Sequence, residues 1–420
     1  MKRIIAICIM FAAGLSCLSA EMNPRKRYIE MKWGFDVYAG QNAMNLTDIF
    51  QKELVLDFPQ IYRNIGNGPL SIDVGLNTTA YDFSVVFGGW GAGIRAGISG
   101  YGTFSVSNDM VQLLAEGNTL DEEQTTSFSL SSGVFINCDI PFYFKVGKLR
   151  FVATPSAFVP MLYIPASNVT VKYTMHSDGS MDLVGSTTAN VYSLAAQNFS
   201  MQDTTKSVSE MTFDAETIFQ SLGVDLSLAV EYPLFKNLDL GGYATVPIIP
   251  GRLNKRLSGG TIVSIHADPV LGTALNGSNP FTVTGPDTKP WVVEDAETFY
   301  VNRPMRLGAE VAWRPFGGNW FVLHGRVGGV MRNPFGKDFT WNLNYIYPEY
   351  KFALQLTGLY VFGLDISTEY TDRVFTHSAG IRLNIRVLEL DATVGISSPS
   401  FLSSFTPDGV KASISMKMGF

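Results

Sequence analysis

Apolar and polar residues alternate one by one over long stretches of this chain, and this pattern constrains its fold more than any other feature. Residues 411–420 are the clearest case: the even positions are apolar, and the odd positions hold lysine, serine or glycine. Alternate side chains of a β-strand point to opposite faces, so the pattern predicts strands with one apolar and one polar face. It recurs at residues 92–106, 127–139, 222–246, 305–331 and 364–394. The chain is therefore predicted to be all-β.

Two architectures produce such strands. A soluble β-sandwich packs its apolar faces inside, but it needs only about seven to nine strands in ~100 residues. Here we expect about 14 strands, within a range of about 12 to 18, each near the ~10 residues that cross a bilayer when tilted. Closing the sheet satisfies every backbone hydrogen bond within lipid. We therefore favour a transmembrane antiparallel up-and-down β-barrel, with the apolar parity facing lipid and the polar parity facing the lumen.

The low charge content agrees with this interpretation. Only 16% of the residues are charged, with 31 basic against 37 acidic side chains, whereas soluble domains have about 25% charged residues. No nucleic-acid partner is expected from this balance. Beyond the N-terminus no stretch approaches the ~18 uninterrupted apolar residues of a spanning helix, so a helical membrane protein is excluded.

The N-terminus has the layout of a secretory signal. Lys2–Arg3 precede an apolar stretch at 4–15, and Ser19–Ala20 offer small residues for cleavage. We predict that residues 1–20 are a signal peptide and that 21–420 form a single barrel domain in the bacterial outer membrane. Outer-membrane lipid and the barrel-assembly machinery are then the expected partners.

Some regions break the alternation. Residues 41–68 and 107–124 hold apolar residues at roughly helical spacing, and we interpret them as rim or plug segments, with Pro59 ending any helix in the first. Residues 251–302 are rich in Gly, Pro, Asn, Asp, Ser and Thr and are predicted to be a long outer loop. A second polar outer loop is expected at 197–211.

Residue patterns for catalysis or metal binding are nearly absent from the sequence. The four histidines are far apart, and none has a cysteine, histidine or carboxylate at metal-ligand spacing on one strand face. His377 is followed directly by Ser378, which a strand would place on the opposite face. We therefore predict no enzyme, no catalytic residue, no metal site and no cofactor.

The polar parity of the later strands carries charges of both signs. The lumen-lining candidates are Arg306, Glu310, Arg326, Asp365, Glu369, Arg382, Arg386, Glu389 and Asp391, joined by Lys411 and Lys417. One interpretation is that they only neutralise one another across neighbouring strands inside a wet barrel. The other is that a subset forms a charged constriction that sets selectivity.

Several features together are typical of one group of barrels. They are a last strand that ends in Phe420, a strand number near fourteen, an amphipathic stretch opened by Asn45–Asp48, and a strand containing Tyr101–Phe104. In these features the chain resembles the FadL-type outer-membrane transporters and related uncharacterised barrel families. The resemblance implies that Phe420 is the signal read by the barrel-assembly machinery, and that the barrel takes up hydrophobic molecules. In that family a hatch fills the lumen before the first strand, whereas here a strand starts by Ile29.

Two functions of different classes follow. The first is passive passage of small solutes across the outer membrane, either hydrophobic molecules through a partly plugged lumen or hydrophilic ones through an open pore. The second is a surface adhesin or structural barrel that binds partners through its outer loops.

Overall fold

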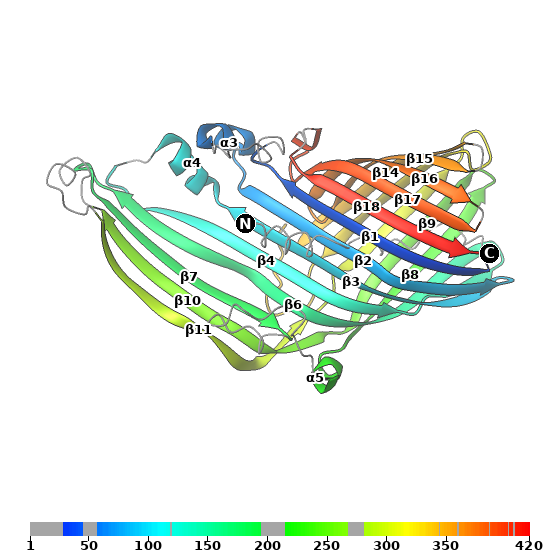
Figure 1. The fold of residues 1–420 in the computed structure, drawn as a ribbon, viewed down its shortest axis with the longest axis horizontal. Coiled ribbons are helices and arrows are strands. Elements are labelled where there is room, and N and C mark those ends of the chain that lie inside the picture. The colour runs from blue at the N-terminus through cyan, green and yellow to red at the C-terminus, as the bar shows by residue number, and fades with distance from the viewer. Residues whose placement is uncertain are drawn as a thin grey trace.

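The protein forms a closed antiparallel β-barrel in the computed structural model (Figure 1). The predicted signal peptide at 1–20 and the loop expected at 197–211 lie outside the described part of the chain. The structure describes residues 28–44, 57–117, 120–194, 215–267, 281–343, 345–358, 361–385, 387–401, 403–405 and 408–420.

Strands dominate the described residues. The strand segments are β1 (Ile29–Gln41), β2 (Leu70–Phe87), β3 (Trp90–Val106), β4 (Gln124–Asp139), β5 (Phe142–Val146), β6 (Leu149–Met175), β7 (Met181–Ser193), β8 (Gly223–Phe235), β9 (Leu238–Ile249), β10 (Gly251–Ala267), β11 (Phe281–Val301), β12 (Met305–Trp313), β13 (Phe321–Met331), β14 (Ile346–Gly358), β15 (Phe362–Thr371), β16 (Val374–Ile385), β17 (Leu388–Ser398) and β18 (Val410–Gly419). The helices are α3 (Phe58–Ile65), α4 (Asn108–Glu116), α5 (Ala215–Gln220) and the short 3-10 helix η3 (Ser403–Phe405).

These eighteen segments make fourteen barrel strands. Four barrel strands are each built from two consecutive segments that share their neighbours: β4 with β5, β7 with β8, β9 with β10, and β11 with β12. The other neighbours in the ring are consecutive along the chain, and β18 pairs with β1 to close it. The predicted up-and-down barrel of about 14 strands is confirmed.

Short turns join the strands at one end of the barrel. Gly88–Gly89 join β2 to β3, and Gly147–Lys148 join β5 to β6. The three glycines have positive φ, which such tight turns require and which glycine adopts without a steric cost. Tyr28 and Phe420 meet at the same end, where Tyr28 N donates to Phe420 O at 2.8 Å. We call this the short-turn end and the opposite one the long-loop end.

The apolar parity of the strands covers the outside of the barrel. Ile381 and Val394 are each 67% exposed and Ile414 is 58% exposed, although all three lie within paired strands. A soluble sandwich would hide this parity in a core, whereas lipid covers it in a membrane barrel. The face assignment made from the alternation is confirmed, and the barrel is a transmembrane one.

Aromatic rings mark the outer surface near the long-loop end. Neighbouring rings lie 4.3 to 5.8 Å apart along the series Tyr350, Tyr370, Phe375, Phe401 and Phe405. A second group, Phe316, Trp320 and Phe321, lies at the short-turn end. Aromatic side chains gather at both membrane interfaces of such barrels, so the two groups bracket the lipid-facing band.

Helices α3 and α4 pack together at the rim of the long-loop end (Figure 1). Ile61 and Ile65 of α3 share a buried cluster with Val111 of α4. Asp57 caps α3 by accepting a hydrogen bond from Gln60 N at 3.0 Å. Pro59 stands in the first turn, where its missing N–H is not needed. It therefore starts the helix, and the prediction that it ends one is wrong. No helix in the described residues is long and apolar enough to cross a bilayer.

Residues 251–302 are mostly strand, so the prediction of a long loop there is wrong. β10 pairs with β11 over Gly251–Ala267 and with β7 over Arg256–Ala267. Glycine and polar residues weaken strand propensity, but a ladder on each side outweighs that preference. Three register shifts in the β10–β11 ladder absorb the irregular positions. β6, β7, β10 and β11 reach farthest at the long-loop end, which is on the left in Figure 1.

The wall changes its construction where β7 ends and β8 begins. Ser193 ends β7 and Gly223 starts β8, although both segments pair with β6. The connection carries α5, and Ser221 O accepts a hydrogen bond from Arg252 N at 3.2 Å. At the same level β9 gives way to β10, and β11 to β12, each time beside a proline, which has no backbone N–H to donate. We call this level the wall break. The described segments on either side of the loop expected at 197–211 therefore lie within the barrel wall and not at the end of a hairpin.

Candidate functional site

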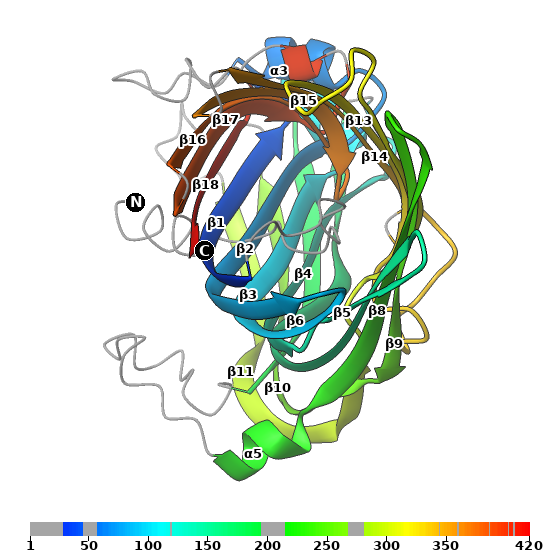
Figure 2. The ribbon, with the colours of Figure 1, turned by 90° about the vertical axis from the view of Figure 1, so that its right-hand side faces the viewer.

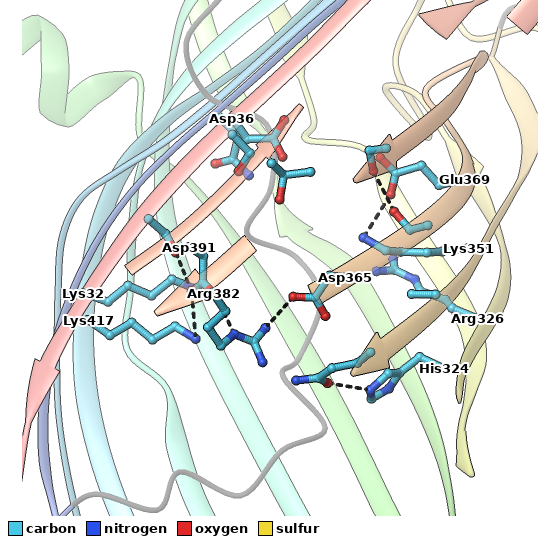
Figure 3. Close-up of a pocket in the computed structure, with 18 of the residues that line it drawn as sticks. Lys32, Asp36, His324, Arg326, Lys351, Asp365, Glu369, Arg382, Asp391 and Lys417 are labelled. Atoms are coloured by element: carbon cyan, nitrogen blue, oxygen red, sulfur yellow. Dashed lines mark hydrogen bonds and ion pairs between the residues drawn. The ribbon is translucent and has the colours of Figure 1, made fainter. Parts of the chain in front are cut away.

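A cavity of about 1420 Å³ occupies the lumen. It extends from Trp320 and Phe420 at the short-turn mouth to Tyr101 and Phe135 deeper inside. Figure 2 looks along the barrel from the side of the short-turn end. In Figure 3 charged side chains from opposite parts of the wall point into one space. The lumen is therefore the candidate site.

Eight of the nine lumen-lining candidates border this cavity. They are Arg306, Glu310, Arg326, Asp365, Glu369, Arg382, Glu389 and Asp391. Lys411 and Lys417 border it as well, and Arg386 lies outside the described residues. Strand parity alone placed these side chains inside. Their role in selectivity stays a prediction.

Ion pairs step around the cavity wall between neighbouring strands. Arg382 Nε donates to Asp391 Oδ1 at 2.5 Å, and Arg382 Nη2 lies 3.4 Å from Asp365 Oδ2. Lys417 Nζ donates to Glu389 Oε1 at 2.9 Å. These five side chains are 15 to 29% exposed, so water in the cavity screens them. We call them the ionic ladder.

Glu369 lies between two lysines farther along the wall. Its Oε2 is 3.0 Å from Lys351 Nζ, and its Oε1 accepts a hydrogen bond from Lys411. Glu310 is directly opposite Arg326 in the β12–β13 ladder. Arg326 donates instead to Glu349, so the carboxylate of Glu310 borders the cavity without that partner.

A buried set of polar side chains crosses the lumen beyond the ladder. Glu349 is its centre: it accepts from Tyr243 Oη at 2.6 Å, from Arg326 Nη2 at 2.7 Å and from Arg306 Nη1. Arg306 also donates through Nη2 to Asp372 Oδ1 at 3.0 Å. Two arginines and two carboxylates thereby compensate one another away from water, which buried charges require.

Arg332 carries this network to the opposite wall. Tyr347 Oη donates to Asp372 at 2.8 Å and accepts from Arg332 Nε at 3.0 Å. Arg332 Nη1 donates to Thr103 Oγ1 at 3.3 Å, and Thr103 donates to Asp73 at 2.7 Å. We call the set from Tyr243 on β9 to Asp73 on β2 the crossing network. Apart from Arg326, its members are at most 7% exposed.

The loop between β13 and β14 begins with three buried residues, Arg332 to Pro334, which the sequence analysis missed. Asn333 is fully buried, accepts from Asn302 N at 2.7 Å and donates to Asp338 at 2.6 Å. Tyr163 Oη on β6 donates to Asp338 at 2.5 Å. The sequence marks this segment only as a Pro-Gly turn, because its partners lie far away along the chain.

Apolar side chains fill the interior at the wall break. The buried members of this aromatic cluster, each at most 8% exposed, are Tyr101, Phe135, Phe158, Val159, Tyr163, Tyr192, Leu194, Leu253, Phe299 and Val301. Ile218 of α5 and Leu222 pack against it. Because Tyr101 and Phe135 also line the cavity, the aromatic cluster and the crossing network together bound its inner end.

His377 and Ser378 lie on opposite faces of β16, as predicted. Ser378 faces the lumen, where its Oγ lies 2.7 Å from Ser367 Oγ. On the outer face, His377 Nε2 lies 2.9 Å from Ser404 Oγ. Ser404 is fully buried and donates to Phe401 O, so its hydroxyl is not presented to a substrate. Within the described residues no group of three His, Cys, Asp or Glu could hold a metal ion.

Comparisons with known proteins find similar barrels. The Pseudomonas putida toluene transporter TodX is 10% identical, with a TM-score of 0.47 over 95% of this chain and 91% of that one. The Ralstonia pickettii toluene transporter TbuX is 9% identical, with a TM-score of 0.44 over 94% and 90%. The translocator domain of the autotransporter NalP from Neisseria meningitidis is 10% identical, with a TM-score of 0.30 over 100% and 94%. No protein-family model and no curated protein sequence matches this chain.

Proposed function

We propose that this protein is a bacterial outer-membrane barrel that passes small hydrophobic molecules inward, with its short-turn end in the periplasm. One observation carries the proposal: an aromatic cluster lies inside the barrel at the level where the wall is interrupted. Ile218 of α5 and Leu222, which follows it, cover that cluster at the wall break, whereas paired strands form the wall elsewhere in the barrel. Such an aromatic lining stabilises an apolar molecule relative to water, so a small hydrophobic molecule inside the barrel can bind there.

The rest of the lumen supports passage of apolar molecules over free passage of water-soluble ones. The crossing network joins β9 to β2 through hydrogen bonds and ion pairs, with four barrel strands lying between them on one side of the ring and eight on the other. An open aqueous pore would have to break it. The cavity on the short-turn side then gives a released molecule a wet exit.

The experiment compares uptake of an apolar and a polar molecule by intact cells. Cells that carry the barrel should take up radiolabelled naphthalene faster than cells without it, whereas arabinose uptake should be equal in both. The purified protein should carry no large steady current in planar bilayers. Large currents with arabinose uptake would favour a hydrophilic pore. Silence in every assay would favour the adhesin or structural barrel.

Ile218→Asp and Leu222→Asp sharpen the test, because a carboxylate on either side chain disrupts the contact with the aromatic cluster. We expect naphthalene uptake to change by several-fold in these variants. The matched control is Leu114→Asp on α4, an exposed apolar residue at the rim.

A further inference from the structure

Three buried charges meet at the inner end of the cavity, where the wall break begins. Asp139 ends β4, Asp225 lies on β8, and Arg303 stands between β11 and β12. Each residue is at most 3% exposed. Arg303 Nε lies 2.8 Å from Asp225 Oδ2, and Arg303 Nη1 lies 3.7 Å from Asp139 Oδ1. They belong neither to the crossing network nor to the ionic ladder.

These groups are close together but incompletely hydrogen-bonded. Asp225 Oδ1, Asp139 Oδ1 and Arg303 Nη2 have no hydrogen-bond partner in the described structure, whereas Arg303 Nε and Asp225 Oδ2 have only each other as an ion-pair partner. Asn137 Nδ2 satisfies Asp139 Oδ2 at 3.2 Å. Arg95 is the β3 residue paired with Asp139 in the sheet, but it donates to Asp82 at 3.1 Å. Buried polar atoms are nearly always paired, so this set calls for a ligand or a function.

Open volume and apolar walls adjoin two of the three charges, and Asp225 lies directly behind Arg303. Asp139 and Arg303 both line the cavity, together with Tyr101 and Phe135 of the aromatic cluster. The guanidinium carbon of Arg303 lies 5.6 Å from the ring centre of Phe158. A molecule placed here would have aromatic surface around its body and unpaired donors and acceptors at one end.

The charges of Asp139, Asp225 and Arg303 determine which polar group that molecule should carry. Two carboxylates face one guanidinium, so a carboxylate ligand would be repelled. A plain hydrocarbon would leave the buried atoms unpaired, which costs affinity. A hydroxyl group is uncharged and can satisfy both kinds of buried atom: it accepts a hydrogen bond from Arg303 and donates one to Asp139 or Asp225.

We propose that Asp139, Asp225 and Arg303 form a binding site for the hydroxyl group of small apolar alcohols and phenols. This inference rests on the proposed function and narrows its substrate class. The barrel then prefers an aromatic alcohol over both the hydrocarbon and the carboxylate of the same size.

Competition binding tests the proposal on the full-length purified barrel in detergent. N-phenyl-1-naphthylamine is the fluorescent apolar probe, and benzyl alcohol, toluene and benzoate displace it at matched free concentrations. We expect benzyl alcohol to displace the probe at a concentration about tenfold or more below that of toluene or benzoate. Equal potency of the three, or a preference for benzoate, overturns the inference and leaves hydrophobic uptake standing. Failure of the barrel to bind the probe overturns the proposed function itself.

Asp225→Asn adds a residue-level test, since the amide keeps the shape but removes one negative charge. The preference for benzyl alcohol over benzoate should fall to within about threefold in this variant. Glu116→Gln on α4 at the rim is the control and should keep the wild-type ranking. Heat-modifiable migration in gels checks that each variant is folded. If Asp225→Asn does not fold, the wild-type ranking alone decides.

Discussion

The ionic ladder and the crossing network use the same residue types on the same inner face of the barrel, but they differ in their access to water. Ladder side chains are 15 to 29% exposed, whereas Glu349 and Asp372 are each 3% exposed. Wet ion pairs contribute little because water already solvates both partners. Dry pairs depend on one another, since loss of one partner leaves a buried charge uncompensated. Depth inside the barrel therefore decides what each charge does.

The largest expected effect comes from breaking the dry region. Arg306→Leu removes the cation shared by Glu349 and Asp372. It should lower the free energy of unfolding by about 3 to 5 kcal/mol. Arg382→Leu in the ladder should lower it by only about 1 kcal/mol. Urea unfolding in lipid vesicles, followed by tryptophan fluorescence, measures both. Similar losses in the two variants would remove the distinction between the regions.

The second prediction compares the inside of the wall with its outside. Leu383 has the lipid-facing parity of Ile381, whereas Asn384 lines the cavity. An arginine on the lipid face costs about 2 to 4 kcal/mol at the bilayer midplane and less toward the interface, so Leu383→Arg, near the short-turn end of β16, should cost about 1 to 2 kcal/mol and a lumenal arginine far less. Asn384→Arg should therefore assemble normally. The folded fraction in the outer membrane, read from heat-modifiable migration, distinguishes them. Equal damage would contradict the face assignment.

Strand parity predicted the ladder of the wet region well, but among the residues of the dry region it marked only Arg306 and Arg326 as lumen-lining candidates. Alternation along β15 to β18 is local, so it placed Asp365, Arg382 and Asp391 inside without knowledge of their partners. The crossing network depends on residues far apart in sequence: Arg332 and Thr103 are separated by 229 positions. Periodicity carries no information about such contacts. Arg332 stands in a turn, where no alternation marks its direction.

The error at 251–302 has a related cause. The composition of β10 and β11 is that of a loop, and only pairing with β7 and with each other makes them strands. Intrinsic strand preference is weak compared with ladder formation. The sequence likewise did not predict the wall break, because the ends of β7 and β8 are set by their pairing with β6 and not by a local sequence pattern.

The third prediction tests how far water reaches toward the dry region. Asn137 lines the cavity, whereas Cys138 has the parity of the exposed Ile136 and faces lipid. A water-soluble maleimide should leave Cys138 unlabelled in intact membranes. In a Cys138→Ser background, Asn137→Cys should be labelled in protein whose short-turn end is accessible. Equal labelling of the two positions would show that the alternation does not separate lipid from water.

The smallest expected effect lies outside the lumen altogether, at an ion pair more exposed than the ladder. His176 follows β6 at the long-loop end, where its Nε2 lies 2.9 Å from Asp182 Oδ2. This hydrogen bond raises the pKa of His176 above its usual value. A raised pKa in the folded state means that the stabilisation is full below the unfolded pKa of about 6.5 and is lost as the pH rises through the folded pKa.

Because the side chains of His176 and Asp182 are both well exposed, this loss of stability should be barely measurable. An NMR titration of His176 should show its pKa falling in Asp182→Asn, and high salt should shrink the difference, since screening acts on exposed pairs. A large, salt-independent effect would mean that exposure does not rank the charges of this barrel.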